Sequence, residues 1–111
     1  MSQQARNAFE LRDAALDWAV AQSQGVPVVI GKYYEDKVIY KAPFDGVEFA
    51  PSRVWETGGP LFAKALQGDA KFREIWLARF ARSHEHVLEM AMQCLVASVC
   101  GDTVDVPSEL L

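Results

Sequence analysis

A short run from residue 51 to residue 61 holds the side chains best suited to binding chemistry. Arg53 carries a planar guanidinium that could bind a phosphate or a carboxylate, and Trp55 offers a face for stacking. Gly58 and Gly59 would let a ligand approach the backbone closely. Together these residues predict a binding loop for a nucleotide-like or other anionic small molecule.

The same run also has a purely structural interpretation. Trp55 could fill the core, while Gly58 and Gly59 permit a sharp turn before a helix that starts at Pro60. The run lacks the lysine directly followed by serine or threonine that a phosphate-binding P-loop carries. Both interpretations expect a loop here, because adjacent glycines and a proline are poor helix formers.

Acidic residues form two further candidate pairs. Asp13 and Asp17 lie four residues apart and share a face of a predicted helix, and Asp102 and Asp105 flank a predicted strand. Paired carboxylates can hold Mg²⁺ or transfer protons, but on an exposed face they more often only interact with water. We keep Asp17 as a candidate ligand-binding residue, because its neighbour Trp18 should be buried and could draw it towards the loop.

Two histidines suggest a metal site only weakly. His84 and His86 are two residues apart, which on a continuous helix turns them about 200° from each other. They could share a metal only if residues 83–86 formed a frayed helix start. We expect solvated histidines, no metal site and no cofactor.

Composition excludes several classes of protein. The chain has 111 residues, half of them apolar, and a net charge of -4. The scattered basic residues form no stripe that could follow a nucleic-acid backbone. No apolar stretch reaches the ~20 residues that span a bilayer, and the polar N-terminus does not resemble a signal peptide. We expect a cytoplasmic protein that binds neither nucleic acid nor membrane.

The two cysteines agree with a reducing compartment. Cys94 and Cys100 lie six residues apart in a predicted helix, which turns them about 240° from each other. That separation prevents an intramolecular disulfide without unwinding the helix. We therefore expect two free thiols that behave as small apolar side chains.

Sequence patterns predict the elements that position these residues. A helix should start between Asn7 and Arg12, run to about Ser23, and end at Gly25. Residues 26–41 are rich in β-branched and aromatic residues and predict strands with a possible hairpin. Residues 42–59 predict a long loop, because prolines and glycines interrupt the pattern.

The second half of the chain contains the clearest predicted helix. Ser83 is a good N-cap for it, and an apolar seam continues to Gly101. Residues 103–106 alternate as a short edge strand does. Residues 72–81 fit either a strand or a helix, and we favour the strand. The simplest architecture is one α+β domain over residues 1–111, with two main helices on a small antiparallel sheet and flexible tails at 1–7 and 108–111.

Three segments together resemble a known family. Their sequences are LDWAVA at 16–21, PSRVWETGGPL at 51–61 and MQCLVASVCGDTVDVP at 92–107. In this order and spacing they are similar to the NinX-like family of small phage and prophage proteins, whose function is unknown. The resemblance implies a phage accessory protein located in the cytoplasm of the host cell.

Three functional hypotheses follow from these observations. The first is a non-enzymatic binding or regulatory protein that contacts a host or phage protein through Arg53, Trp55, Gly58 and Gly59. The high aromatic content of the chain could also leave apolar surface for a homodimer interface. The second is a protein that binds or sequesters a nucleotide-like ligand at the same loop and Asp17. The third is a small hydrolase-type enzyme, for which the sequence offers no catalytic residues.

Overall fold

The α+β fold class predicted from the sequence is confirmed. The computed structural model describes residues 2–42, 46–82 and 86–111, which form one compact domain. In chain order the elements are β1 Gln3–Asn7, η1 Ala8–Glu10, α1 Asp13–Gln24, β2 Val28–Tyr33, β3 Asp36–Lys41, α2 Trp55–Gly68, α3 Ala70–Phe80, α4 Val87–Cys100, β4 Thr103–Pro107 and η2 Ser108–Leu110.

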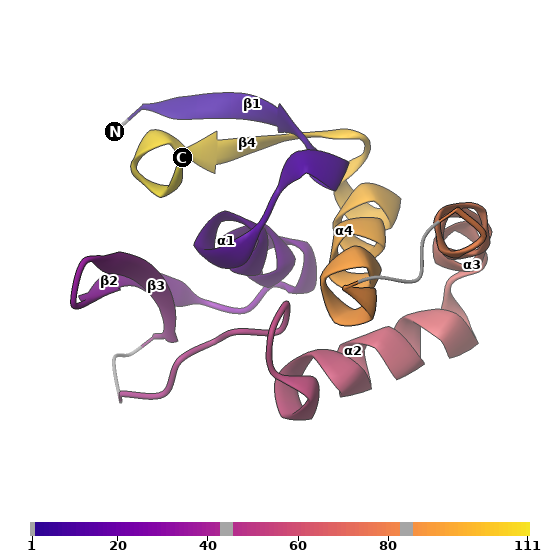
Figure 1. Ribbon diagram of the computed structural model, residues 1–111, viewed down its shortest axis with the longest axis horizontal. Coiled ribbons are helices and arrows are strands. Elements are labelled where there is room, and N and C mark those ends of the chain that lie inside the picture. Colours follow the sequence, from indigo (N-terminus) through magenta and orange to yellow (C-terminus); the bar gives the residue numbers. More distant parts are fainter. Residues whose placement is uncertain (1, 43–45, 83–85) are drawn as a thin grey trace.

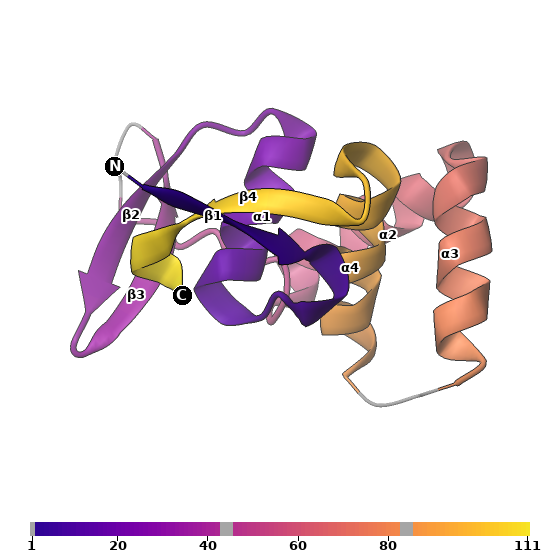
Figure 2. The same cartoon turned by 90° about the horizontal axis from the view of Figure 1, so that it is seen from above.

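The strands form two separate antiparallel pairs instead of one small sheet. β1 pairs with β4, placing Gln3 opposite Pro107, and β2 pairs with β3 in a hairpin. The β1–β4 ribbon crosses above α1 and α4, with the hairpin at one end of the molecule and α2 and α3 at the other (Figure 1, Figure 2). The edge strand predicted at 103–106 is confirmed as part of β4.

The core lies between α1 and α4. Both helices contribute small buried residues to it, among them Ala15 and Ala19 of α1 and Ala91 and Cys94 of α4. Gln93 is also buried, and its Nε2 donates a hydrogen bond to the carbonyl of Leu11 at 2.8 Å. This bond satisfies a buried polar group and ties the segment before α1 to the core helix.

The start of the chain differs from the prediction in a limited way. Asn7 does act as a cap, because its side chain accepts a hydrogen bond from the backbone N–H of Phe9, but it caps η1 and not the long helix. The long helix starts at Asp13, and Gly25 ends it in the left-handed conformation with φ 67°. The segments for which the sequence predicts flexible tails contain β1 at residues 3–7 and η2 at residues 108–110.

Residues 72–80 lie in helix α3, so the strand favoured for residues 72–81 is wrong. The Asp69 side chain accepts a hydrogen bond from the backbone N–H of Phe72 and caps α3. Phe72 and Trp76 are buried one helical turn apart, and both rings contact Phe62 of α2. The exposed Leu77 explains the ambiguity, because it adds an apolar residue that is not part of the buried face.

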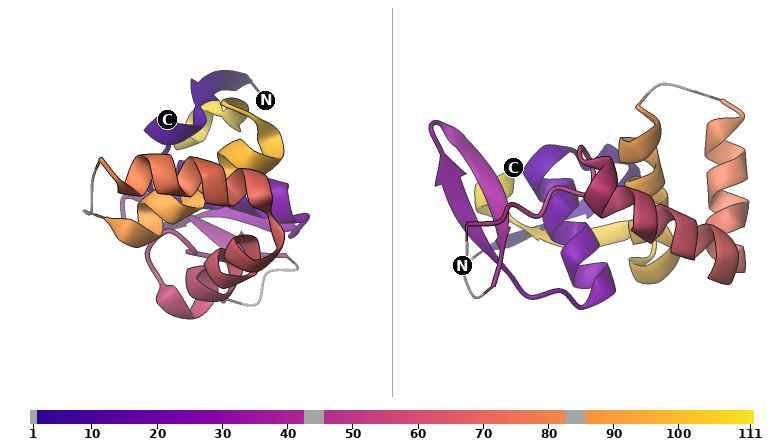
Figure 3. Two further views of the ribbon diagram at one scale, coloured as in Figure 1. Left: turned by 90° about the vertical axis from the view of Figure 1, so that its right-hand side faces the viewer. Right: turned by 90° about the horizontal axis from the view of Figure 1, so that it is seen from below.

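The Gly-Gly-Pro run also lies within a helix, which corrects the prediction of a loop through residue 59. α2 begins at Trp55 and contains Gly58, Gly59 and Pro60. Together, α2 and α3 form the end of the molecule opposite the hairpin (Figure 3). Tertiary packing overrides the low helix propensity of these residues here. No helix in the described ranges is long and apolar enough to cross a membrane.

Candidate functional site

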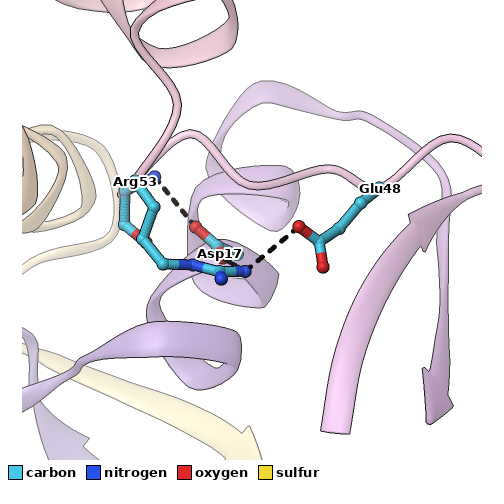
Figure 4. A network of polar contacts seen from close by, with 4 residues as sticks. Asp17, Glu48 and Arg53 are labelled. Atoms are coloured by element: carbon cyan, nitrogen blue, oxygen red, sulfur yellow. Dashed lines mark hydrogen bonds and ion pairs between the residues drawn. The ribbon is translucent and has the colours of Figure 1, made fainter. Parts of the chain in front are cut away.

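Asp17 and Arg53, two of the predicted binding residues, lie together in the structure. Asp17 is on the buried face of α1 with 1% of its surface exposed. The backbone N–H of Ser52 donates to Asp17 Oδ1 at 2.9 Å, and Arg53 Nη2 lies 3.8 Å from Asp17 Oδ2 (Figure 4). Asp17 thus lies against this loop as expected, although its neighbour Trp18 is only partly buried and not buried as predicted.

Arg53 also connects to the segment that follows β3. Its Nη2 donates to Glu48 Oε2 at 3.2 Å, and Glu48 itself forms a β-bridge with Tyr40 of β3. We call Asp17, Glu48, Ser52 and Arg53 the Arg53 cluster. The cluster joins α1, β3 and the start of α2, which are far apart in sequence.

The charge balance of the Arg53 cluster does not favour an anionic ligand at Arg53. One guanidinium contacts the carboxylates of both Asp17 and Glu48. With both ionised, the cluster has a net charge of -1, so a phosphate arriving at Arg53 would meet two carboxylates. The arrangement is suited to holding the backbone in place.

Burial changes the acidity of Asp17. Its desolvation raises the pKa of the carboxyl from 3.8 to about 6, while hydrogen bonding from Ser52 and the positive charge of Arg53 act in the opposite direction. Glu48 adds a smaller upward effect. Asp17 is therefore a buried acid that changes charge just below neutral pH.

The two glycines have structural roles that differ from each other. A Cβ on Gly58 would lie 2.0 Å from the carbonyl oxygen of Pro51 and 2.9 Å from Leu88 Cδ1. A Cβ on Gly59 would only touch the Trp55 ring at 3.5 Å. Gly58 is thus required for the close approach of α2 to the preceding loop, and its backbone is not open to a ligand.

Trp55 lies on the surface, so the interpretation in which it fills the core is wrong. Its side chain is 56% exposed on the first turn of α2, next to Val54, which is 41% exposed. We call these two side chains the Trp55 surface. Leu88 and Pro51, and not Trp55, fill the space beside Gly58.

A polar groove of about 740 Å³ lies beside the Arg53 cluster. Its walls come from the hairpin, the start of α1 and η2, with Arg12, Lys37 and Arg53 as positive residues and Asp13, Glu35, Asp36, Glu48 and Glu109 as negative ones. Negative side chains thus outnumber positive ones. Trp55, Gly58 and Gly59 are not among the described residues that line it.

The remaining sequence candidates do not converge on one site. His84 and Glu85 lie outside the described residues, while His86 precedes α4 in a left-handed conformation with φ 51°. Within the described ranges, no group of three or more His, Cys, Asp or Glu residues could hold a metal ion. Asp13 and Asp17 separate: Asp13 is exposed and lines the groove, whereas Asp17 is buried.

The two cysteines also lack a shared role. Cys94 is buried in α4, and its desolvation raises the pKa of the thiol to about 11. Cys100 is exposed at the end of the same helix. Both are free thiols, and Cys94 remains protonated at neutral pH, which makes it a poor nucleophile.

Sequence comparisons add no relatives to this description. No family model matches the chain, and no curated protein is significantly similar to it. Of the four residues in the Arg53 cluster, sequence reasoning did not name Glu48 and assigned no binding role to Ser52. Spacing could not have found Ser52, because its partner Asp17 lies 35 residues away, whereas Glu48 lies only five residues before Arg53 and was overlooked.

Proposed function

We propose that this protein is a phage or prophage accessory protein of the NinX-like type that acts in the host cytoplasm by binding a protein partner, without catalysis. The three motifs at 16–21, 51–61 and 92–107 support the phage origin through their resemblance to that family. Two of them meet in the structure, since Asp17 of the first motif contacts Ser52 and Arg53 of the second.

The observation that carries the proposal is the exposed position of Trp55. Tryptophan is the residue type most enriched among side chains that dominate the affinity of protein interfaces. Here more than half of its side chain is exposed next to the partly exposed Val54. An exposed pair of apolar side chains of this kind is better suited to a protein partner than to a charged small molecule.

The backbone below the Trp55 surface is firmly held. Ser52 is hydrogen-bonded to the buried Asp17, and Gly58 packs directly against the Pro51 carbonyl. A side chain that is already positioned before binding loses less conformational entropy when the complex forms. The Arg53 cluster would therefore act by presenting Trp55, and not by contacting a ligand itself.

A second candidate is a small-molecule binder, which the polar groove favours. Its volume of about 740 Å³ lies in the range of ligand sites, and Arg53 is part of its wall. The excess of carboxylates argues against a nucleotide-like anion there. A hydrolase is supported less, because the acid with the raised pKa, Asp17, is buried beneath Ser52.

The proposal can be tested by comparing two exposed apolar side chains. Trp55→Ala should remove a specific partner captured from phage-infected cells, and should weaken the purified complex at least about 30-fold, as expected for a dominant interface tryptophan. Leu77→Ala is a matched control, because Leu77 is 66% exposed but lies on α3. Both variants should keep the melting temperature of the parent protein.

Two results would contradict the proposal. One is equal capture of every partner by the Trp55→Ala and Leu77→Ala variants. The other is a large rise in melting temperature with a nucleotide or another small molecule, if Arg53→Ala abolishes that rise and Trp55→Ala does not. The second result would support the groove as the binding site.

A further inference from the structure

The outer edge of β2 carries backbone groups without hydrogen-bond partners in the described chain. The carbonyl of Pro27 accepts from the backbone N–H of Ala42 at 3.0 Å, just before the first register pair of the hairpin. In an antiparallel ladder hydrogen-bonded pairs alternate along the strand, so Val29, Gly31 and Tyr33 bond to β3. The backbone groups of Val28, Ile30 and Lys32 therefore point away from the hairpin.

The opposite edge of the hairpin is already occupied. On the far side of β3, Phe49 N donates to Ile39 O at 2.7 Å and Lys41 N donates to Val47 O at 3.2 Å. β2 lies at the extreme end of the molecule, away from the helices (Figure 2, Figure 3). Among the described residues, the hairpin thus has one edge without backbone hydrogen-bond partners, and that edge is β2.

The chemistry of this edge does little to prevent pairing. Natural edge strands are usually protected by several charges, an internal proline or a bulge. β2 has a continuous register with β3 and one charged residue, Lys32. Pro27 precedes the strand at a position that faces Ala42, so its missing N–H leaves the outer edge intact.

We propose that β2 pairs antiparallel with β2 of a second copy, around a two-fold axis at Ile30. This register places Ile30 opposite Ile30 and Val28 opposite Lys32, forming about six backbone hydrogen bonds. A register centred on Lys32 would place two lysines opposite each other. One centred on Val28 would bring Lys32 opposite Gln24, which belongs to α1. Only the Ile30 register uses all three outward residues of both copies.

Side chains fit this arrangement as well. Val29 of one copy falls opposite Gly31 of the other, and the Tyr40 ring already covers Gly31 within its own hairpin. Val29 and Tyr33 are 40% and 60% exposed in the single chain, so pairing would cover part of this apolar area. The edge is therefore complementary to itself, which favours a second copy over an unrelated strand.

Light scattering coupled to size-exclusion chromatography tests the assembly. The parent protein should have twice the chain mass of 12.3 kDa. Lys32→Pro removes an outward N–H without touching the β2–β3 ladder, and should return the mass to that of one chain. Lys32→Ala keeps the N–H and should remain dimeric. A single-chain mass for the parent at all concentrations would overturn the proposal. In that case the open β2 edge would be left for a strand of another protein.

A cysteine experiment tests the register and does not depend on the proline variant. In a Cys100→Ser background, Ile30→Cys should form an intermolecular disulfide, because the paired Cα atoms would be about 5.5 Å apart. Lys32→Cys should not, because the two positions would be about 13 Å apart. Equal cross-linking of both variants, or cross-linking of Lys32→Cys alone, would overturn this register.

Discussion

The Arg53 cluster and the β2–β3 hairpin both present exposed aromatic side chains, but they support them differently. Trp55 stands on a helix whose first turn packs against the Pro51 carbonyl, and the Ser52 backbone just before that helix is bonded to the buried Asp17 carboxylate. Tyr33 and Tyr34 stand at the tip of a two-stranded ribbon whose β2 edge is open. The first region is held by the Pro51 carbonyl and the Asp17 carboxylate. In the second region the buried Val38 and Ile39 anchor β3, but the exposed tip depends mainly on the β2–β3 ladder.

This difference teaches how the two surfaces could recognise partners. A side chain on a held backbone offers a fixed shape, so selectivity comes from the fit of one large residue. A free strand edge offers backbone groups, which any extended segment can pair with, so selectivity must come from the register and the side chains. Adding a Cβ to a closely packed glycine in each region should therefore change the free energy of unfolding by different amounts.

The largest effect is expected for Gly58→Ala. The new Cβ would lie 2.0 Å from the backbone oxygen of Pro51, which cannot move aside without displacing Ser52 and its bond to Asp17. We expect a loss of about 3 kcal/mol in the free energy of unfolding, measured by urea denaturation.

Gly59→Ala is the matched control for this substitution. It lies in the same helix and meets only the Trp55 ring at 3.5 Å, an ordinary contact. Alanine is the better helix former, so we expect a gain of about 0.5–1 kcal/mol. If both variants changed stability equally, the close approach at Gly58 would not be what holds this region together.

Asp17 gives the second largest effect, and it depends on pH. Its carboxyl titrates near 3.8 in the unfolded chain and at about 6 in the folded protein. Between these values the folded state binds the proton more tightly, so the free energy of unfolding falls as the pH rises. The loss should be roughly 2–3 kcal/mol and nearly complete by about pH 7, one unit above the folded-state pKa.

Asp17→Asn should remove this loss, because the amide does not titrate. Urea denaturation of both proteins between pH 4 and pH 7 measures the difference, in which the remaining carboxyls largely cancel. Arg53→Gln should extend the window of falling stability to higher pH, since Arg53 lowers the pKa of Asp17. Parallel pH profiles for the parent and Asp17→Asn would show that burial does not perturb this carboxyl.

Local sequence signals predicted the elements that depend on local interactions. The hairpin at 26–41, the left-handed Gly25 after α1, the main part of α4 and strand β4 all follow from residue type and periodicity. The nearness of Asp17 to the loop at Arg53 was also expected. The α+β class follows from these elements, because each has an apolar face that another must cover.

Contacts between distant segments explain the errors. The first part of α2, residues 55–60, has the composition of a loop, and only the Pro51 carbonyl against Gly58 shows why a glycine is needed there. α3 was ambiguous because the exposed Leu77 imitates strand alternation. β1 could not be recognised alone, since its five residues are mostly exposed and its partner is β4 at the other end of the chain.

The smallest effect is expected for Gly31→Ala in the hairpin. A Cβ there would lie 2.5 Å from Tyr40 Cε2, which is closer than a normal contact but involves a side chain and not the backbone. Because the ring can turn about its χ angles, we expect a loss of about 1 kcal/mol, well below that of Gly58→Ala. The same urea denaturation measures it. Introducing Gly31→Ala into a Tyr40→Ala protein should cost almost nothing, since the obstructing ring is gone. If the loss persisted in that background, the strand backbone and not the Tyr40 ring would limit the space at Gly31, and the hairpin would be held as rigidly as the Arg53 cluster.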